Sequence, residues 1–301
     1  MRLRHTLIGG LSATLVAVSG IGFATAQANA GQRQQAPQSA PAVPPEIPSA
    51  EPMKHLAALQ KIADENGGTR AHGRPGFKAS ADYIKKTLDD AGFQTSLQSF
   101  TYQGATGYNV LAEWPHGDAN DVVMIGAHLD SVTAGPGIND DGSGTAAVLS
   151  NALAVAKADL RPTKRMRFGW WGAEEIGLIG SKHYVQTLSA AEKSKIKYYL
   201  NFDMVGYKAS KTWGIYNHSP EVSAMWKRHL DAKQVSTKAI SWNGSSDHSS
   251  FASAGIKVSG IGVDEDPNYH TRGDTISNVG DKAIGISTNA IADVFWQLAG
   301  A

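Results

Sequence analysis

From Glu51 onward, apolar residues follow two patterns that alternate along the chain. In one pattern they recur every three or four positions, as at Met53, Leu56 and Leu59, which is typical of one face of an amphipathic helix. In the other they form short apolar runs bounded by turn-forming residues, as in residues 122–127, which is typical of a buried strand. The pattern predicts helices over residues 53–62, 77–88, 141–158, 179–188, 221–232 and 282–298, and strands over residues 95–102, 108–114, 122–127, 165–173, 197–206 and 258–263.

The alternation of strands and helices predicts the fold class. Strands that alternate with helices favour an α/β fold, here a single domain with a mostly parallel central sheet and helices on both faces. In such sheets, ligands bind at the carboxyl ends of the strands. The residues that follow each predicted strand are therefore the first candidates for a functional site.

The first 30 residues have the features of a signal peptide. Arg2 and Arg4 give a positively charged start, an apolar stretch covers residues 7–23, and the small residues Ala28 and Ala30 form a cleavage site. The alternative is an uncleaved membrane anchor, for which the stretch is short and rich in glycine. We expect export to the periplasm or the medium after cleavage near Ala30.

Residues 31–50 differ in composition from the rest of the chain. They read GQRQQAPQSAPAVPPEIPSA, which is rich in Pro, Gln and Ala and has almost no apolar periodicity. Such a segment is typical of a flexible linker or a pro-segment outside the core. The folded domain is then predicted over residues 51–301, a length that can bury one substantial core.

The charge balance and the lack of cysteine exclude several classes of function. The chain has 28 Lys and Arg residues against 27 Asp and Glu residues, with no basic stripe of the kind that binds nucleic acid or acidic lipid. It has no cysteine, so disulfides and thiolate metal sites are excluded, and any metal must be held by His, Asp and Glu, which suits zinc or harder ions. The G-x-S-x-G pattern of serine hydrolases is absent.

Acidic residues and histidines lie near or just past the carboxyl ends of four of the predicted strands. A single Asp-rich loop is usually turn chemistry. Four such loops at one edge of a sheet need compensating cations, because a buried, unpaired carboxylate is costly. The side chains predicted at this edge are His128, Asp140 and Asp141, then Glu174 and Glu175, then Asp203, and finally Asp264, Glu265, Asp266, Tyr269 and His270.

Six short motifs carry a resemblance to a known family. They are AHLDS, GINDDGSG, WWGAEEIGLIGS, NFDMVG, SDH and YHTRGDT, and they occur in the order that the family has them. The chain resembles the secreted di-zinc aminopeptidases of the M28 type and is similar to bacterial leucyl aminopeptidases. The resemblance covers roughly residues 51–301 and implies a fold of the zinc-exopeptidase type.

The resemblance implies a set of metal ligands. His128 and Asp203 would hold one zinc ion, Glu175 and His270 the other, and Asp140 would bridge the two. Two Zn²⁺ ions, three carboxylates and one bridging hydroxide sum to zero charge, so such a site would have no net charge. Calcium binding elsewhere stays open, although nothing in the sequence indicates a calcium site.

The two adjacent glutamates need different roles, and the residues alone do not say which of them is a ligand. The resemblance makes Glu175 the ligand and Glu174 the general base that accepts the proton of the attacking water. Asp130 is interpreted as the carboxylate that receives the imidazole N–H of His128, with a turn-capping aspartate as the alternative. The resemblance also implies a cis peptide between Asp140 and Asp141.

Substrate contacts are predicted at two further motifs. Tyr269 resembles the residue that hydrogen-bonds the oxyanion in some members of the family, and the alternative is a packing tyrosine on a loop. Bacterial relatives often hold this loop with a disulfide, which this chain lacks. Ser246-Asp247-His248 matches an element near the substrate amine, where some relatives carry Arg in place of Ser246.

Together these features predict a metal-dependent exopeptidase. It would hydrolyse the N-terminal peptide bond of peptides or proteins, prefer large apolar N-terminal residues, and act through a hydroxide that bridges two zinc ions. Two alternatives stay open, a single-zinc glutaminyl cyclase and a non-catalytic binding domain on the same scaffold. We expect a monomer that binds neither nucleic acid nor, after signal cleavage, a membrane.

Overall fold

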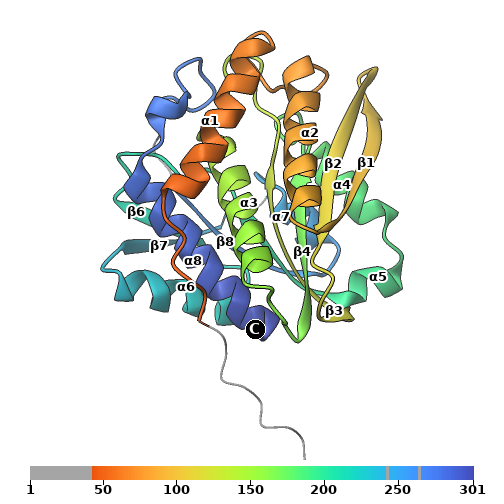
Figure 1. The fold of residues 1–301 in the computed structure, drawn as a ribbon, viewed down its shortest axis with the longest axis vertical. Helices are drawn as coiled ribbons and strands as arrows, with labels where there is room; N and C mark the ends of the chain where they lie inside the picture. The colour runs from red at the N-terminus through yellow and green to blue at the C-terminus, as the bar shows by residue number, and fades with distance from the viewer. Residues whose placement is uncertain (1–42, 242–243, 264–265) are drawn as a thin grey trace, which may run out of the picture. The chain divides into compact units, whose positions relative to one another are not determined.

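An eight-stranded mixed sheet organises the residues that the computed structural model describes, 43–241, 244–263 and 266–301 (Figure 1). The strand order is β1-β2-β4-β3-β5-β8-β6-β7. The strands are β1 (Gln94–Tyr102), β2 (Ala105–Glu113), β3 (Asp118–His128), β4 (Lys164–Trp171), β5 (Ile196–Phe202), β6 (Thr212–Tyr216), β7 (Ser236–Ile240) and β8 (Lys257–Val263).

The four central strands run parallel. β3 pairs in parallel with β4 and β5, and β5 with β8. The antiparallel pairs lie towards the margins, where β2 joins β1 and β4 and where β6 joins β8. The predicted α/β fold with a mostly parallel sheet is therefore confirmed, and the carboxyl ends of β3, β4, β5 and β8 share one edge.

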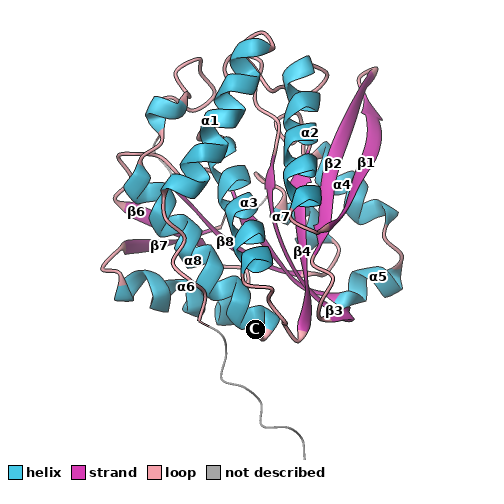
Figure 2. Ribbon diagram, viewed as in Figure 1, coloured by secondary structure: helices cyan, strands magenta, loops and turns pink. Residues whose placement is uncertain are grey.

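Helices cover both faces of the sheet, as predicted. They are α1 (Ala50–Glu65), α2 (Pro75–Asp90), α3 (Gly142–Lys157), α4 (Ile179–Thr187), α5 (Ala190–Lys195), α6 (Pro220–Ala232), α7 (His248–Ser253) and α8 (Asp281–Ala299), with a 3₁₀ turn, η1, at Ile276–Asn278. In Figure 2, α1, α2, α3 and α8 lie in front of the sheet. They and α6 supply the larger apolar core, whereas α4 and α7 supply a smaller core on the other face.

The alternation of side chains along β3 links the two cores. Val123 and Ile125 belong to the larger core, and Val122 and Met124 to the smaller one. Successive side chains of a strand point to opposite faces, so an unbroken apolar run is what a strand buried on both faces requires. This is why residues 122–127 could be predicted as a central strand.

Helix α3 packs within the larger core, and many of its buried residues are small. Its first residues are buried, and a Cβ at Gly144 would come 2.1 Å from the carbonyl oxygen of Phe202. Only glycine allows this approach. The close contact places the start of α3 beside the end of β5, where the site residues lie.

The folded domain begins earlier than residue 51. Ile47 is 5% exposed, its N–H donates to Oδ1 of Asn289 at 2.9 Å, and Nδ2 of Asn289 donates back to its carbonyl oxygen at 2.9 Å. The predicted boundary was therefore wrong for this segment, because one apolar residue and a pair of hydrogen bonds to α8 dock it on the domain. The signal peptide predicted over residues 1–30, and residues 31–42, lie outside the described residues.

Five of the described elements were not predicted, namely α5, β6, β7, α7 and the 3₁₀ turn η1. Strand β7 has the sequence STKAI and lies at the margin of the sheet with partly exposed side chains. It therefore has no apolar run from which a strand could be predicted. The strand predicted over residues 197–206 ends at Phe202, because the backbone turns at Met204, whose φ is 56°. Within the part of the chain that the structure describes, no helix is both long and apolar enough to cross a membrane.

Candidate metal centre

The predicted site residues do gather at one edge of the sheet. His128 is the last residue of β3, Asp203 directly follows β5, and Glu174 and Glu175 follow β4. Asp203 and the two glutamates open onto a cavity of about 460 Å³, and His128 is buried behind them. The cavity is lined by Asp140, Glu174, Glu175, Asp203, Met204, Ser245, Val263, Asp266, Tyr269 and His270. Asp264 and Glu265, also predicted at this edge, lie outside the described residues.

Asp140 stands between two histidines. Its Oδ1 lies 3.1 Å from Nε2 of His128, and its Oδ2 lies 3.1 Å from Nε2 of His270. One carboxylate that turns one oxygen to each imidazole has the arrangement that a ligand shared by two cations requires.

The adjacent glutamates diverge from one another. Oε2 of Glu175 lies 2.9 Å from Nε2 of His270, whereas Oε2 of Glu174 lies 3.9 Å from Nε2 of His128. Oδ1 of Asp203 is 3.8 Å from the same His128 nitrogen. The structure thus divides the side chains into one group around His128 and another around His270, with Asp140 common to both.

The donor atoms fit a zinc site. Candidate ligand atoms lie within 4.8 Å of one another in two overlapping groups, His128 with Asp140 and Glu175, and His128 with Asp141 and Asp203. Among the described residues, Oε1 of Glu175 is buried without a hydrogen-bond partner. Imidazole nitrogen and carboxylate oxygen are zinc ligands, and a buried oxygen without a partner is what a missing cation would leave.

Asp141 is engaged by the backbone instead. Its Oδ1 accepts hydrogen bonds from the N–H of Gly144 at 2.8 Å and of Met204 at 3.2 Å, and its Oδ2 accepts one from the N–H of His128 at 3.2 Å. It therefore caps α3 and ties that helix to the residues that follow β3 and β5. The peptide between Asp140 and Asp141 is cis, as the resemblance implied.

The site has too many buried carboxylates for its own cations. Burial raises the pKa of Glu175 to about 7 and that of Asp203 to about 6. Burial would also raise the pKa of Asp140, but hydrogen bonds from the two histidines hold it to about 2. Hydrogen bonds to Asp140 and Glu175 raise the pKa of His270 to about 10. Without metal, protonated histidine therefore supplies the positive charge that these carboxylates require.

Three residues of the site, one candidate ligand and two neighbours of ligands, have left-handed backbone. They are Ala173, Met204 and His270, with φ of 58°, 56° and 57°. This conformation is unfavourable for residues other than glycine, and such residues cluster at functional sites where the surroundings enforce them. Each of the three lies within a strand-end loop that aims a ligand at the cavity.

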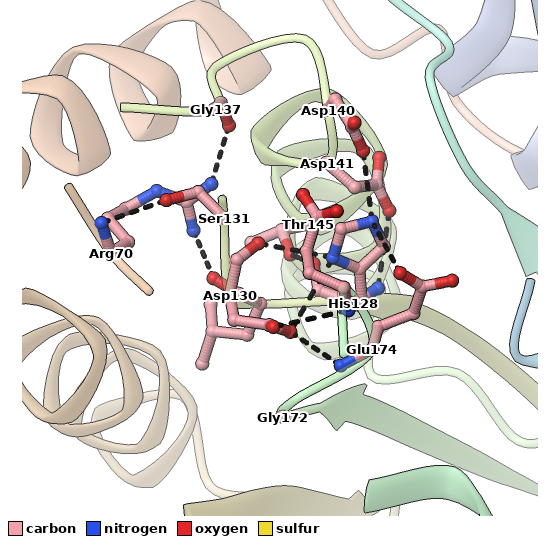
Figure 3. A network of polar contacts seen from close by, with 12 residues as sticks. Arg70, His128, Asp130, Ser131, Gly137, Asp140, Asp141, Thr145, Gly172 and Glu174 are labelled. Atoms are coloured by element: carbon pink, nitrogen blue, oxygen red, sulfur yellow. Dashed lines mark hydrogen bonds and ion pairs between the residues drawn. The ribbon is translucent and has the colours of Figure 1, made fainter. Parts of the chain in front are cut away.

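Asp130 contacts both His128 and the loop that follows β4. Its carboxylate accepts hydrogen bonds from the N–H of Glu174 at 3.0 Å and of Glu175 at 3.4 Å (Figure 3). The Nδ1 atom of His128 faces the backbone oxygen of Asp130 at 3.1 Å, and the nearest carboxylate oxygen lies farther away at 3.7 Å. Asp130 therefore lies beside the imidazole, where its predicted role as the acceptor for His128 stays a prediction, and it also binds the loop after β4 through two backbone donors.

Arg70, between α1 and α2, was missed by the sequence analysis. It is fully buried, and its guanidinium donates to the backbone oxygens of Leu129, Pro136 and Gly137, the last two at 2.9 and 2.5 Å. Figure 3 shows the contact with Gly137. It thereby shapes the loop that leads from β3 to Asp140. No local signal marks it, since a lone Arg in GGTRAHG is ordinary in a connection between helices.

Ser246 contacts a candidate ligand. Its hydroxyl donates to Oδ2 of Asp203 at 2.6 Å and accepts from Nδ2 of Asn201 at 2.8 Å. It thus orients the carboxylate of Asp203. Its neighbour Asp247 is fully buried, and burial raises its pKa to about 7.

Tyr269 lines the cavity mouth beside His270. Its ring is 50% exposed and stacks on the His270 imidazole, with centroids 3.7 Å apart. Trp170 and Trp171 are fully buried and belong to the two cores. His229 forms an ion pair with Asp293 at 3.1 Å, away from the cavity.

Sequence comparison places the chain among peptidases. The model of peptidase family M28 matches residues 109–295. Leupeptin-inactivating enzyme 1 of Streptomyces exfoliatus is 48% identical over 306 residues, which cover 95% of this chain and 69% of that protein. Leucine aminopeptidase 2 of Trichophyton rubrum is 36% identical over 222 residues, 64% of this chain and 44% of that one. The chain thus spans less than half of the fungal protein.

Solved structures share the fold. A zinc aminopeptidase from Bacillus subtilis superposes with a TM-score of 0.76 at 18% identity, covering 83% of this chain and 95% of its own. An aminopeptidase from Aneurinibacillus sp. strain AM-1 gives 0.75 at 19% identity, covering 85% and 95%.

Proposed function

The chain belongs to peptidase family M28, and from this membership we propose that it is a metal-dependent aminopeptidase. It hydrolyses the peptide bond behind the N-terminal residue of a peptide or protein. The observation that carries the proposal is Asp140, whose two oxygens each lie 3.1 Å from a different histidine. The names of the relatives, among them leucine aminopeptidase 2, support the reaction class.

Two zinc ions are proposed as the cofactor. His128 and Asp203 would hold one, Glu175 and His270 the other, and Asp140 would be shared. When bound, zinc polarises the scissile carbonyl and lowers the pKa of water, so that water becomes a nucleophile at neutral pH. The excess of buried carboxylates over cations supports a site built for positive charge.

Glu174 is proposed as the general base. Its N–H is held by Asp130 and its side chain is 10% exposed, so the carboxylate is positioned at the cavity rather than in bulk water. Burial raises the pKa of Glu174 well above its usual value, which favours proton transfer near neutral pH. Glu174 takes a proton from the attacking water and passes it to the leaving amine.

The remaining lining supports an exopeptidase with an apolar preference. Glu174 and Asp203 place negative charge where a free α-ammonium group would sit. Met204 and Val263 offer apolar surface for the N-terminal side chain. Tyr269 lies beside His270 at the mouth, where its hydroxyl would donate a hydrogen bond to the oxyanion. We further propose that the enzyme is exported and acts as a monomer.

The test separates the two glutamates. In Glu174→Gln, zinc content should stay at two ions per chain while kcat on a leucyl anilide falls by about 10²–10⁴-fold, the usual contribution of general acid–base catalysis. In Glu175→Gln, zinc content itself should fall, measured by atomic absorption. The opposite pattern would show that the two roles are exchanged, and one zinc ion in the unmodified chain would favour the cyclase chemistry instead.

A further inference from the structure

The loop between β8 and α8 holds His270 without a covalent cross-link. The chain has no cysteine, and the His270 side chain is 39% exposed, so packing alone does not fix it. Its backbone is left-handed, with φ of 57°, a conformation that an L-residue keeps only when its surroundings enforce it. Other contacts must therefore set where this imidazole points.

Asp274 supplies such contacts to three consecutive residues of the β3–α3 loop. Its backbone oxygen accepts the N–H of Ile138 at 3.1 Å, its Oδ1 accepts that of Asn139 at 2.8 Å, and its Oδ2 accepts that of Asp140 at 2.9 Å. Asp274 is 2% exposed. A buried carboxylate with a backbone donor on each oxygen is held in one orientation, because rotation would leave both donors unpaired.

Asp266, at the start of the same loop, is joined to this contact. Its Oδ2 accepts from Nδ2 of Asn139 at 2.7 Å and from Nδ2 of Asn278 at 2.6 Å. Asn278 also donates to Oδ1 of Asp274 at 3.2 Å. Hydrogen bonds through Asn278 thus join Asp266 and Asp274, which flank His270 in this loop, and Asp266 is also bonded to Asn139.

We propose that Asp274 is a positioning residue of the metal centre, which joins the His270 loop to the backbone of Asp140 and so sets how these two side chains face one another. This inference rests on the proposed function, because it assigns a role toward zinc. Asp274 touches neither the cavity nor the imidazole, and it acts through the loop. The other half of the centre is held separately, since Thr145 anchors the backbone of His128 at 2.6 Å.

The test is zinc binding by Asp274→Asn. The amide keeps the size of the side chain but turns an NH₂ group towards a backbone N–H. The whole purified chain is stripped of metal and titrated with Zn²⁺ against a chromogenic chelator, with His270→Ala as the reference that removes one half of the centre. The affinity that His270→Ala abolishes should fall by about 10–100-fold in Asp274→Asn, the usual effect of losing a contact behind a ligand. The affinity for the other ion, which shares only Asp140 with this half, should fall by a clearly smaller factor.

Asp118→Asn is the matched control. Its carboxylate also accepts a backbone N–H, that of Asn120 at 2.8 Å, but it lies at the opposite end of β3 from His128. It should leave both zinc affinities as in the wild type. Unchanged binding in Asp274→Asn, or an equal loss at both sites together with a lower melting temperature, would overturn the inference.

A second variant covers the case in which Asp274→Asn does not fold. Asn278→Ala leaves the bonds from Asp274 to the backbone and removes the bridge to Asp266. It should weaken the same zinc affinity by a smaller factor, and two unchanged affinities would overturn the inference. Wild-type protein that binds no zinc would instead contradict the proposed function.

Discussion

Replacing Arg70 by Met should destabilise the protein strongly, although Arg70 lies outside the cavity. Methionine fills most of the space of the apolar stem and removes the guanidinium. The backbone oxygens of Leu129, Pro136 and Gly137 then lose their donor in a buried place. Several carboxylates also lose a neighbouring cation, and Asp130 and Asp274 are the two that interact most strongly with the Arg70 charge.

The magnitude follows from two opposing contributions. Each hydrogen bond from a charged donor contributes about 1.5–3 kcal/mol, so three of them set an upper limit of about 5–9 kcal/mol. Burying the guanidinium costs free energy, as its lowered pKa indicates, and the substitution recovers that cost. Removing one partner of a buried charged contact costs about 3–5 kcal/mol in net terms, and we expect a free energy of unfolding lower by that amount.

The assay is thermal unfolding followed by circular dichroism. At about 2–4 °C per kcal/mol for a domain of this size, the melting temperature should fall by roughly 6–20 °C. Arg70→Lys is the companion variant, because it keeps the charge but not the planar fork of donors, and its melting temperature should lie between those of Arg70→Met and the wild type. A melting temperature of Arg70→Met within about 2 °C of the wild type would refute the reasoning, since it would correspond to less than 1 kcal/mol.

Three further outcomes test the site. Asp140→Ala should lose both zinc ions, whereas His128→Ala should weaken mainly one, as metal analysis after dialysis would show; an Asp140→Ala protein with two tightly held ions is incompatible with a shared ligand. Metal-free protein should melt at a higher temperature at pH 5 than at pH 8. The raised pKa values of Glu175 (about 7), Asp203 (about 6) and His270 (about 10) favour proton uptake by the folded state, so this stability is present at low pH and is lost as pH rises through them; an opposite or flat profile would contradict it. Leucyl peptides should be cleaved and their N-acetylated forms left intact in a mass-spectrometric assay, and cleavage inside a blocked peptide would indicate an endopeptidase.

Local sequence was sufficient for the fold class and for the residues that gather at the cavity. An apolar run such as residues 122–127 indicates a strand buried on both faces, and a parallel sheet brings the residues after its strands to one edge. His128 and Asp203 lie within one residue of a strand end, so their placement follows from the sheet itself. Tyr269 and His270 lie farther along the loop after β8, where the strand pattern indicated the edge of the sheet and the motif YHTRGDT indicated their roles.

What only the tertiary structure decided is which distant groups hold these residues in place. Asp130 turned out to face the backbone of Glu174, 44 residues away, and Asp274 that of Asp140, 134 residues away. Arg70 and the loop it shapes are likewise far apart in sequence. Periodicity and turn chemistry act over a few residues, whereas these hydrogen bonds depend on the paths of several loops that meet at one edge. A lone Arg or Asp has the same local context whether it faces water or fills such a place, so the sequence determined the elements and the folded chain determined their partners.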